Sequence, residues 1–255
     1  MPKITPHVKR VLEMPEAGDL PTVDTAHRVL EALQEQGLAA KSVKTYYNAW
    51  RHYCGTMGVA THDWPKAPNP PRKVRPMLTR NQALNVIKMV ESGERLQGKH
   101  KADALRLGLH AGLRLFKEAV RPDGWIWLEH NDDAGYSIML VSGKGGHERE
   151  VIVLDPETRA IEGPPPINGK TAARAFETAV AKVTDNPYVR RGNLPTPHSL
   201  RHIYAGHLYD GNKDIIATRN QLGHTNVATT EHYLEHTRRD DLAAKLVDDA
   251  RRAAS

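Results

Sequence analysis

The first 64 residues alternate apolar and polar positions with the period of amphipathic helices. Apolar residues recur at helical spacing over residues 22–36 and again over residues 41–55. One face of the second segment collects Val43, Tyr46, Tyr47, Trp50, Tyr53 and Cys54, and the opposite face collects Lys41, Lys44, Asn48 and Arg51. The pattern predicts a small helical domain with an aromatic core and one basic face.

A proline-rich segment, WPKAPNPPRKVRP, interrupts the helical pattern at residues 64–76. Because proline lacks a backbone N–H and has a fixed φ, this density of prolines excludes a helix and favours extended chain. The cations of the segment are Lys66, Arg72, Lys73 and Arg75. We predict a basic linker over residues 65–78, between domains of residues 1–64 and 79–255. It either follows a DNA backbone or is an ordinary solvated connection.

The second domain begins with helical patterns and continues with short strands. Thr79 and Gln82 have the spacing of a capping box, which predicts a helix to about Glu91, and a second helix is expected over residues 101–113. Three β-like segments follow, separated by turns rich in Gly, Asn and Asp, at residues 125–129, 136–141 and 149–154. The predicted fold is mainly α with a small antiparallel β-sheet: a helical N-terminal domain, then an α+β domain with a C-terminal helical tail.

Composition narrows the class of protein. The chain has 255 residues, and 36 Lys and Arg against 30 Asp and Glu give a net charge of +6, which favours a polyanionic partner. A hydrophobic content of 39% is enough for a core and excludes disorder throughout. The single cysteine, Cys54, excludes an intramolecular disulfide. With neither a secretory signal nor an apolar run long enough to span a bilayer, we expect a cytoplasmic protein without membrane contact.

The candidate chemistry is concentrated in residues 197–237. Thr196-Pro197 is a typical helix start, with proline at the first helical position. In the helix that follows, His198 and Arg201 are three residues apart on a flank beside the apolar stripe. We therefore expect both side chains outside the buried core, where they can face one external ligand.

A second and a third helix complete this region. The second, over residues 214–222, is expected to end at Gly223, because glycine suits the left-handed position after a helix. His224 follows at a turn, and Tyr233 lies nine residues further on. Guanidinium groups match phosphate oxygens, a phenol can act as a nucleophile, and imidazoles transfer protons near neutral pH. The set predicts phosphoryl-transfer chemistry.

Several short motifs follow one another between residues 111 and 233. They are Ala111-Gly112-Leu113-Arg114, Gly143-Lys144-Gly145-Gly146, His198-Ser199-Leu200-Arg201, Leu222-Gly223-His224 and Thr229-Thr230-Glu231-His232-Tyr233. Together they resemble the tyrosine recombinase, or phage-type integrase, family over roughly residues 79–240. Residues 1–64 are similar to the family's helical core-binding domain. The sequence departs from the family at one place: Lys117 stands where a glutamate is usual, and Glu118 follows it.

The resemblance implies a catalytic role for each matching residue. The implied set is Arg114, Lys144, His198, Arg201, His224 and Tyr233. Tyr233 would attack the scissile phosphate and form a 3′-phosphotyrosyl bond, while the two arginines hold the non-bridging oxygens. Lys144 would protonate the leaving 5′-oxygen, His198 would assist proton transfer at the tyrosine, and His224 would donate a hydrogen bond to the phosphate. The protein–DNA bond retains the phosphodiester energy, so the resemblance implies no metal, no ATP and no other cofactor.

The resemblance also implies partners. These are double-stranded DNA, a homotetramer assembled on that DNA, and accessory DNA-bending proteins, for a cytoplasmic, nucleoid-associated protein of a prokaryote, phage or mobile element. The candidate DNA-binding residues are Lys41, Lys44, Arg51, Arg72, Lys73 and Arg75. An apolar stripe in the tail, formed by Leu242, Leu246, Val247 and Ala250, docks either on its own domain or on a neighbouring subunit.

Three other classes of function remain open at this point. A type IB topoisomerase would use the same chemistry only to relax supercoils, and a catalytically silent DNA-binding protein could have the same fold. The third is a metal-dependent hydrolase, since six histidines occur between residues 198 and 236. These histidines scatter around their helices without an H-E-x-x-H motif, so we expect no metal site.

Overall fold

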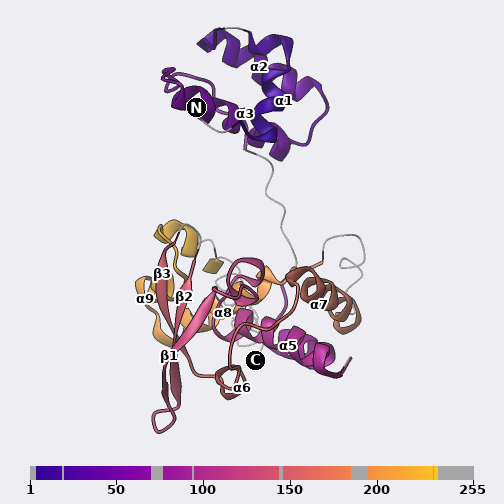
Figure 1. Cartoon of the computed structure of the whole chain (residues 1–255), viewed down its shortest axis with the longest axis vertical. Helices are drawn as coiled ribbons and strands as arrows, with labels where there is room; N and C mark the ends of the chain where they lie inside the picture. Colours follow the sequence, from indigo (N-terminus) through magenta and orange to yellow (C-terminus); the bar gives the residue numbers. More distant parts are fainter. Residues whose placement is uncertain are drawn as a thin grey trace, which may run out of the picture. The chain divides into compact units, whose positions relative to one another are not determined.

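The computed structural model of the chain describes residues 4–18, 20–69, 77–93, 95–143, 146–184, 194–231 and 233–234. The chain forms two compact units, residues 1–74 and residues 75–255 (Figure 1). Among the described residues, no helix combines the length and the apolar character needed to cross a bilayer.

The N-terminal unit is a helical bundle around aromatic side chains. Its elements are α1 (Pro6–Leu12), a 3-10 turn η1 (Pro15–Ala17), α2 (Val23–Glu35) and α3 (Ala40–Thr56). The ring of Trp50 packs against Tyr47 and Trp64, with centroids 6.0 and 4.8 Å apart. Ala67 belongs to the same core, and Lys44 Nζ donates a hydrogen bond to Asn69 Oδ1. The packing of this unit thus continues into the segment predicted to be the linker.

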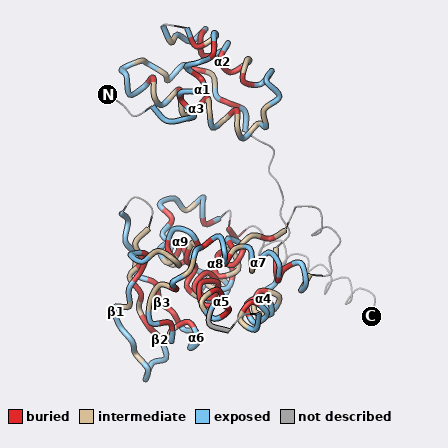
Figure 2. Tube along the Cα trace, turned by 45° about the vertical axis from the view of Figure 1, so that its right-hand side comes forward, coloured by how far each residue is buried: buried red, intermediate tan, exposed pale blue. Residues whose placement is uncertain are grey.

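Four helices form the centre of the larger unit. They are α4 (Arg80–Ser92), α5 (Arg95–His110), α7 (Gly169–Val183) and α8 (His198–Asn212). The predicted capping box is present: Thr79 N donates to Gln82 Oε1 at 2.9 Å, and Gln82 N donates to Thr79 Oγ1 at 3.2 Å. α5 packs against α4, α7 and α8. Figure 2 shows the buried residues concentrated along α5 and α8, which are the centre of the core.

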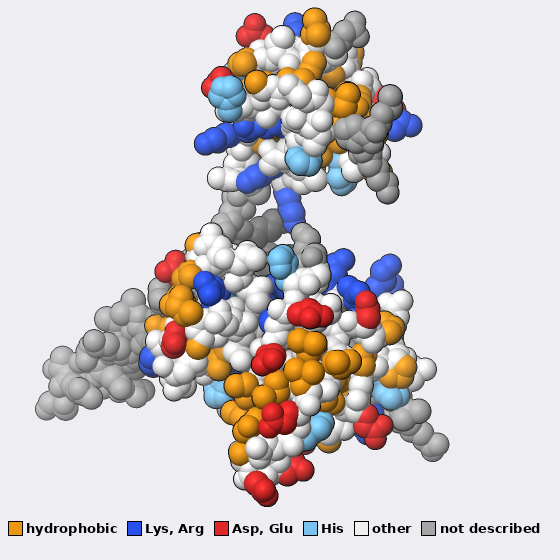
Figure 3. All heavy atoms as spheres, turned by 60° about the vertical axis from the view of Figure 1, so that its left-hand side comes forward, with side chains coloured by type: hydrophobic (Ala, Val, Ile, Leu, Met, Phe, Trp, Pro, Cys, Tyr) orange, Lys and Arg blue, Asp and Glu red, His pale blue; other side chains and the backbone are white. Residues whose placement is uncertain are grey.

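A three-stranded antiparallel sheet covers one side of these helices. It is formed by β1 (Trp125–Asn131), β2 (Tyr136–Ser142) and β3 (Glu148–Val153), in the order β1-β2-β3. Alternate residues of β3, Val151 and Val153, are buried in one cluster with Leu107 of α5. The other face exposes apolar side chains, among them Ile126 and Ile152, and Figure 3 shows such side chains on the surface with acidic groups among them. The sheet therefore has one face in the core and one at the surface.

Two short helices and the last described segment complete the unit. α6 (Pro156–Arg159) follows the sheet, and α9 (Ile215–Leu222) packs against β3. Residues 227–231 and 233–234 are also helical. The predicted fold class, mainly α with a small antiparallel sheet, is confirmed.

Two predicted helix boundaries differ from the structure. The helix expected over residues 101–113 begins at Arg95 and ends at His110, because Gly112 adopts a left-handed conformation with φ of +64°. Pro197 is the N-cap of α8 rather than its first helical residue. By contrast, α9 ends at Leu222 before Gly223, as expected, and Gly223 has φ of +64°.

Candidate active site

The first arginine of the site stands at the start of a π-helical turn. This turn, η2 (Leu115–Ala119), is closed by Ala119 N, which donates to Arg114 O at 3.1 Å. The five-residue spacing leaves Lys117 exposed and turns Glu118 into the core, where it is 0% exposed. Glu118 Oε1 accepts from Arg114 Nη1 at 2.5 Å, and Oε2 accepts from Arg114 N at 2.8 Å. The π-turn therefore accommodates the extra residue between the arginine and its carboxylate.

Arg201 is at the centre of the core, and the expectation that it lies outside is wrong. Its side chain is 0% exposed. Its Nη1 donates to the carbonyl oxygen of Gly112 and its Nη2 to that of Leu222, and Glu118 Oε2 lies 3.6 Å from Nη1. Burial, followed by the charge of Arg114, lowers the pKa of Arg201 to about 10, which leaves it cationic at neutral pH. The two carbonyls and the carboxylate offset much of the cost of burying this guanidinium, while its buried Nε has no hydrogen-bond partner.

His224 follows the glycine that ends α9 and contacts Arg201. Its Nε2 lies 3.2 Å from Arg201 Nη2, and its Nδ1 lies 3.0 Å from Thr230 Oγ1. Since a guanidinium can only donate, Nε2 accepts, and the ring is neutral with its proton on Nδ1. Burial and the charges of Arg201, Arg114 and Arg149 lower the pKa of His224 to about 3. Without DNA, this imidazole is uncharged at neutral pH.

Tyr233 lies among three histidines. Its Oη is 2.6 Å from His198 Nε2. Its ring stacks on His202, with centroids 3.8 Å apart at 17°, and meets the ring of His224 at 4.7 Å and 63°. Tyr233 is 7% exposed, whereas His198 is exposed at the start of α8. The phenol is thus hydrogen-bonded to an imidazole that reaches solvent, a suitable arrangement for moving its proton.

A small cavity of about 240 Å³ opens beside this cluster. Arg114, His224 and Gly223 line it, together with Arg149 of β3. Three guanidinium groups, those of Arg114, Arg149 and Arg201, share the carboxylate of Glu118, and Glu148 is the second carboxylate at this cavity. The cluster keeps an excess of positive charge, which an anion such as a phosphate group can neutralise.

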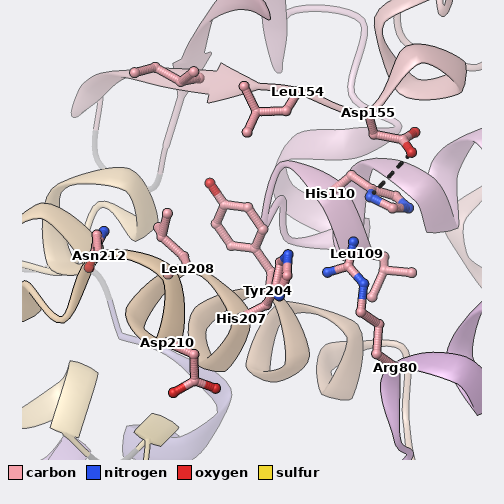
Figure 4. Close-up of a pocket in the computed structure, with 12 residues that line it drawn as sticks. Arg80, Leu109, His110, Leu154, Asp155, Tyr204, His207, Leu208, Asp210 and Asn212 are labelled. Carbon is pink, nitrogen blue, oxygen red and sulfur yellow. Dashed lines mark ion pairs between the residues drawn. The ribbon is translucent and has the colours of Figure 1, made fainter.

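A larger cavity of about 600 Å³ lies elsewhere in the unit (Figure 4). Leu109, Leu154, Tyr204 and Leu208 give it apolar walls, and His110 Nδ1 lies 3.6 Å from Asp155 Oδ1 at its edge. None of the predicted catalytic residues lines this cavity. Within the described residues, no group of three or more His, Cys, Asp or Glu side chains is placed to hold a metal ion.

The remaining predicted site residues lie either outside the described residues or on the N-terminal unit. Lys144, Arg72, Lys73 and Arg75 lie outside the described residues, as does the apolar stripe of the tail. Lys41, Lys44 and Arg51 lie on α3 of the N-terminal unit. Arg51 Nη2 donates to Thr61 O at 2.6 Å, and Lys41 is exposed.

Sequence reasoning missed Arg149 and Gln221. Arg149 alternates with Val151 and Val153 along β3, so the strand period places it on the buried face. That period was the available signal for a buried arginine. Nothing in the local pattern of α9 indicates that Gln221 O accepts from Arg149 Nε at 3.0 Å, because 72 residues separate the two.

Comparison with known proteins finds related sequences. The sequence model of the phage integrase family matches residues 163–239, which contain His198, Arg201, His224 and Tyr233. The tyrosine recombinase XerC of Neisseria gonorrhoeae is 27% identical over 263 residues, covering 92% of this chain and 82% of that protein. The tyrosine recombinase XerC of Pseudomonas aeruginosa is 27% identical over 220 residues, covering 79% of this chain and 70% of that protein.

Solved structures share the fold. The XerH site-specific recombinase bound to palindromic difH substrate in a post-cleavage complex has a TM-score of 0.60 at 15% identity, over 88% of this chain and 72% of that chain. A lambda integrase dimer bound to a COC′ core site has a TM-score of 0.56 at 20% identity, over 89% of this chain and 84% of that chain. The family match over residues 163–239 and the similarity to the named relatives identify a phage integrase domain in this chain and support a tyrosine-type site-specific recombinase.

Proposed function

We propose that this recombinase cuts and rejoins double-stranded DNA through a covalent bond between Tyr233 and a 3′-phosphate. The observation that carries the proposal is the 2.6 Å contact between Tyr233 Oη and His198 Nε2, beside the Arg201–His224 pair. A nucleophile within hydrogen-bond reach of a base, next to fixed guanidinium groups, is the arrangement that attack on a phosphodiester requires.

The chemical step balances without an external energy source. Tyr233 Oη forms a bond to phosphorus, and the bond from phosphorus to the 5′-oxygen breaks. The tyrosine proton passes to His198 Nε2, and a general acid protonates the departing 5′-oxygen. The resemblance gives this last role to Lys144, so its place in the mechanism is part of the proposal. Attack by a 5′-hydroxyl of another strand reverses the step and completes strand exchange.

The two arginines stabilise the charge that develops in the transition state. Arg201 is held by two backbone carbonyls, and Arg114 is held by Glu118, so neither has to reorganise when the phosphate gains charge. Donors fixed in advance in a water-poor site are the strongest contributors to this kind of catalysis. A bound phosphate offsets the positive charge around the imidazole of His224, so the ring can take up a proton. The protonated ring then donates a hydrogen bond to the phosphate.

The basic residues outside the site bind the DNA backbone. Lys41, Lys44 and Arg51 on α3 and the predicted linker cations Arg72, Lys73 and Arg75 supply sequence-independent phosphate contacts. The enzyme assembles as a homotetramer on its DNA, with accessory DNA-bending proteins as further partners. It acts as a nucleoid-associated cytoplasmic protein.

Trapping of covalent protein–DNA adducts tests the proposal. The wild-type chain is incubated with genomic DNA of its host, adducts are collected under denaturing conditions, and the attached DNA is sequenced. We expect adducts from the wild type and from Tyr209→Phe, and none from Tyr233→Phe. Tyr209 is a suitable control because it lies on α8 and packs against the apolar cluster that contains Tyr233 but is not a predicted catalytic residue. The wild type and the two variants should bind DNA equally.

The products decide between recombination and simple relaxation. A plasmid that carries two copies of the recovered sequence should yield recombinant joints with the wild type. Adducts formed by Tyr233→Phe, or topoisomers without any recombinant joint, would overturn the proposal.

A further inference from the structure

Arg149 connects parts of the site that are far apart in the sequence. Its side chain is 8% exposed. Nη1 donates to Glu118 Oε1 at 3.1 Å, and Nη2 donates to Glu118 Oε2 at 2.9 Å. Its Nε donates to the carbonyl oxygen of Gln221 at 3.0 Å. One guanidinium thus joins β3, the π-turn after Arg114 and the last turn of α9.

The contact with α9 determines where His224 is placed. A helix leaves its last carbonyls without partners, and here Arg149 takes that of Gln221 while Arg201 takes that of Leu222. The next residues are Gly223 and His224, so the two arginines fix the chain immediately before the imidazole. Gln221 also uses its side chain, because Ile152 N of β3 donates to its Oε1 at 3.0 Å.

The backbone at Gly223 is shaped to the stem of Arg149. A Cβ atom at position 223 would lie 2.6 Å from Arg149 Cδ, and Gly223 has φ of +64°. Only glycine fits such a close approach in this conformation. The end of α9 and the Arg149 side chain therefore pack directly against each other.

The charge of Arg149 also determines how the other arginines are held. Glu118 is fully buried and accepts both terminal nitrogens of Arg149 in a bidentate pair. Burial raises the pKa of Glu118, but the hydrogen bonds and charge of Arg149, with contributions from Arg114 and Arg201, bring it down to about 2. The bidentate pair holds the carboxylate plane in one orientation, and the same two oxygens face Arg114 and Arg201.

We propose that Arg149 is a positioning residue of the recombination reaction: it fixes Glu118 and the carbonyl end of α9 so that Arg114, Arg201 and His224 converge on one phosphate. Arg149 acts through these groups and does not itself transfer a proton or form a bond to phosphorus. The inference rests on the proposed phosphotyrosyl chemistry. According to this inference, the reaction requires the forked geometry of the Arg149 guanidinium as well as its charge.

The test compares two lysine substitutions at equally buried arginines. Arg149→Lys keeps the charge and loses the fork. Arg106→Lys is the matched control, because the Arg106 side chain is also 8% exposed and pairs with carboxylates, those of Glu91, Asp103 and Glu157, away from the site. Each variant is measured for the dissociation constant of DNA, the melting temperature and the single-turnover rate of adduct formation at saturating DNA.

Misplaced catalytic groups slow the chemical step without weakening binding. We expect Arg149→Lys to lower the single-turnover rate by ~10²-fold, as small displacements in an active site do, with DNA affinity unchanged. Arg106→Lys should lower the melting temperature about as much as Arg149→Lys does, but should keep the wild-type rate of adduct formation. In Arg149→Ala, millimolar guanidinium should restore part of the rate, and sodium chloride at the same ionic strength should not.

A wild-type rate in Arg149→Lys, or an equal loss of rate in both lysine variants, would overturn this inference and leave the proposed function intact. Absence of adducts from the wild-type chain would instead overturn the proposed function and this inference together.

Discussion

Glu118 is the carboxylate that three arginines of the site share. It has 0% exposure, and its partners are Arg114, Arg149 and Arg201 at 2.5, 2.9 and 3.6 Å. Burying a charge is costly unless opposite charges and hydrogen bonds compensate for it. Here the compensation is mutual, because the carboxylate makes the buried guanidinium groups tolerable and they keep it ionised.

Glu118→Gln should strongly destabilise the larger unit. The substitution keeps the shape but leaves Arg149 and Arg201 without their carboxylate, and breaking a buried ion pair in this way costs about 3–5 kcal/mol. Glu157→Gln is the control, because Glu157 pairs with Arg106 through a side chain that is 72% exposed, and surface pairs contribute less than about 1 kcal/mol. Urea unfolding measures both. Equal losses in the two variants would contradict the central place of Glu118.

His224 should make the stability of the fold depend on pH. Its pKa is lowered from 6.5 to about 3, so below pH 6.5 the unfolded chain binds a proton that the folded chain does not. Stability contributed by His224 is therefore full above pH 6.5 and falls as the pH drops toward 3. Glu118 adds to the loss only at lower pH, between its ordinary pKa of 4.5 and about 2.

Unfolding at pH 7 and pH 5 isolates the histidine when the wild type is compared with His224→Asn, because burial also lowers the pKa of His110 and of His207 and both proteins share these two groups. We expect the wild type to lose on the order of 1–2 kcal/mol over this interval and His224→Asn to lose less. His62→Asn, at an exposed histidine of the N-terminal unit, should behave as the wild type. A wild-type loss in His224→Asn would show that the imidazole is not held neutral.

At the scale of elements, the glycine that ends α9 can be tested by substitution. Gly223 and Gly135 both have left-handed backbones, with φ of +64° and +75°, but only Gly223 faces a neighbour. Alanine costs about 1–2 kcal/mol at a left-handed position. We expect Gly135→Ala to lose this amount and to cut DNA normally. Gly223→Ala should lose more free energy of unfolding than Gly135→Ala does. It should also slow adduct formation, because the new Cβ would displace Arg149.

The elements were predictable wherever a local period exists, and the site only in part. The helices, the strands and the capping box at Thr79 follow from apolar spacing and local residue types. The burial of Arg201 does not, because its partners are the carbonyls of Gly112 and Leu222, 89 and 21 residues away. The π-turn is similarly invisible, since only the packed carboxylate of Glu118 shows which residue turns inward.

At the scale of the whole molecule, one basic helix face belongs to a different unit from the chemistry. The catalytic cluster lies within residues 75–255, while the basic face of α3 belongs to residues 1–74. The net charge of +6 is small for a DNA-binding protein of 255 residues, so where the cations lie matters more than their number. We expect the N-terminal unit to contribute affinity without contributing to the chemical step.

Salt dependence of DNA binding separates these contributions. Each phosphate contact releases counterions, so the plot of log K against log salt has a negative slope, and its magnitude falls by about 0.9 for each contact removed. The double variant Lys41→Ala, Lys44→Ala should reduce the magnitude of the slope by nearly 2. It should leave the rate of adduct formation at saturating DNA unchanged. Lys9→Ala is the control, because Lys9 lies on α1 and pairs with Glu13 at 3.7 Å. An unchanged slope in the double variant would show that the basic face of α3 does not contact DNA phosphates. A lower rate of adduct formation at saturating DNA would show that this face also affects the chemical step.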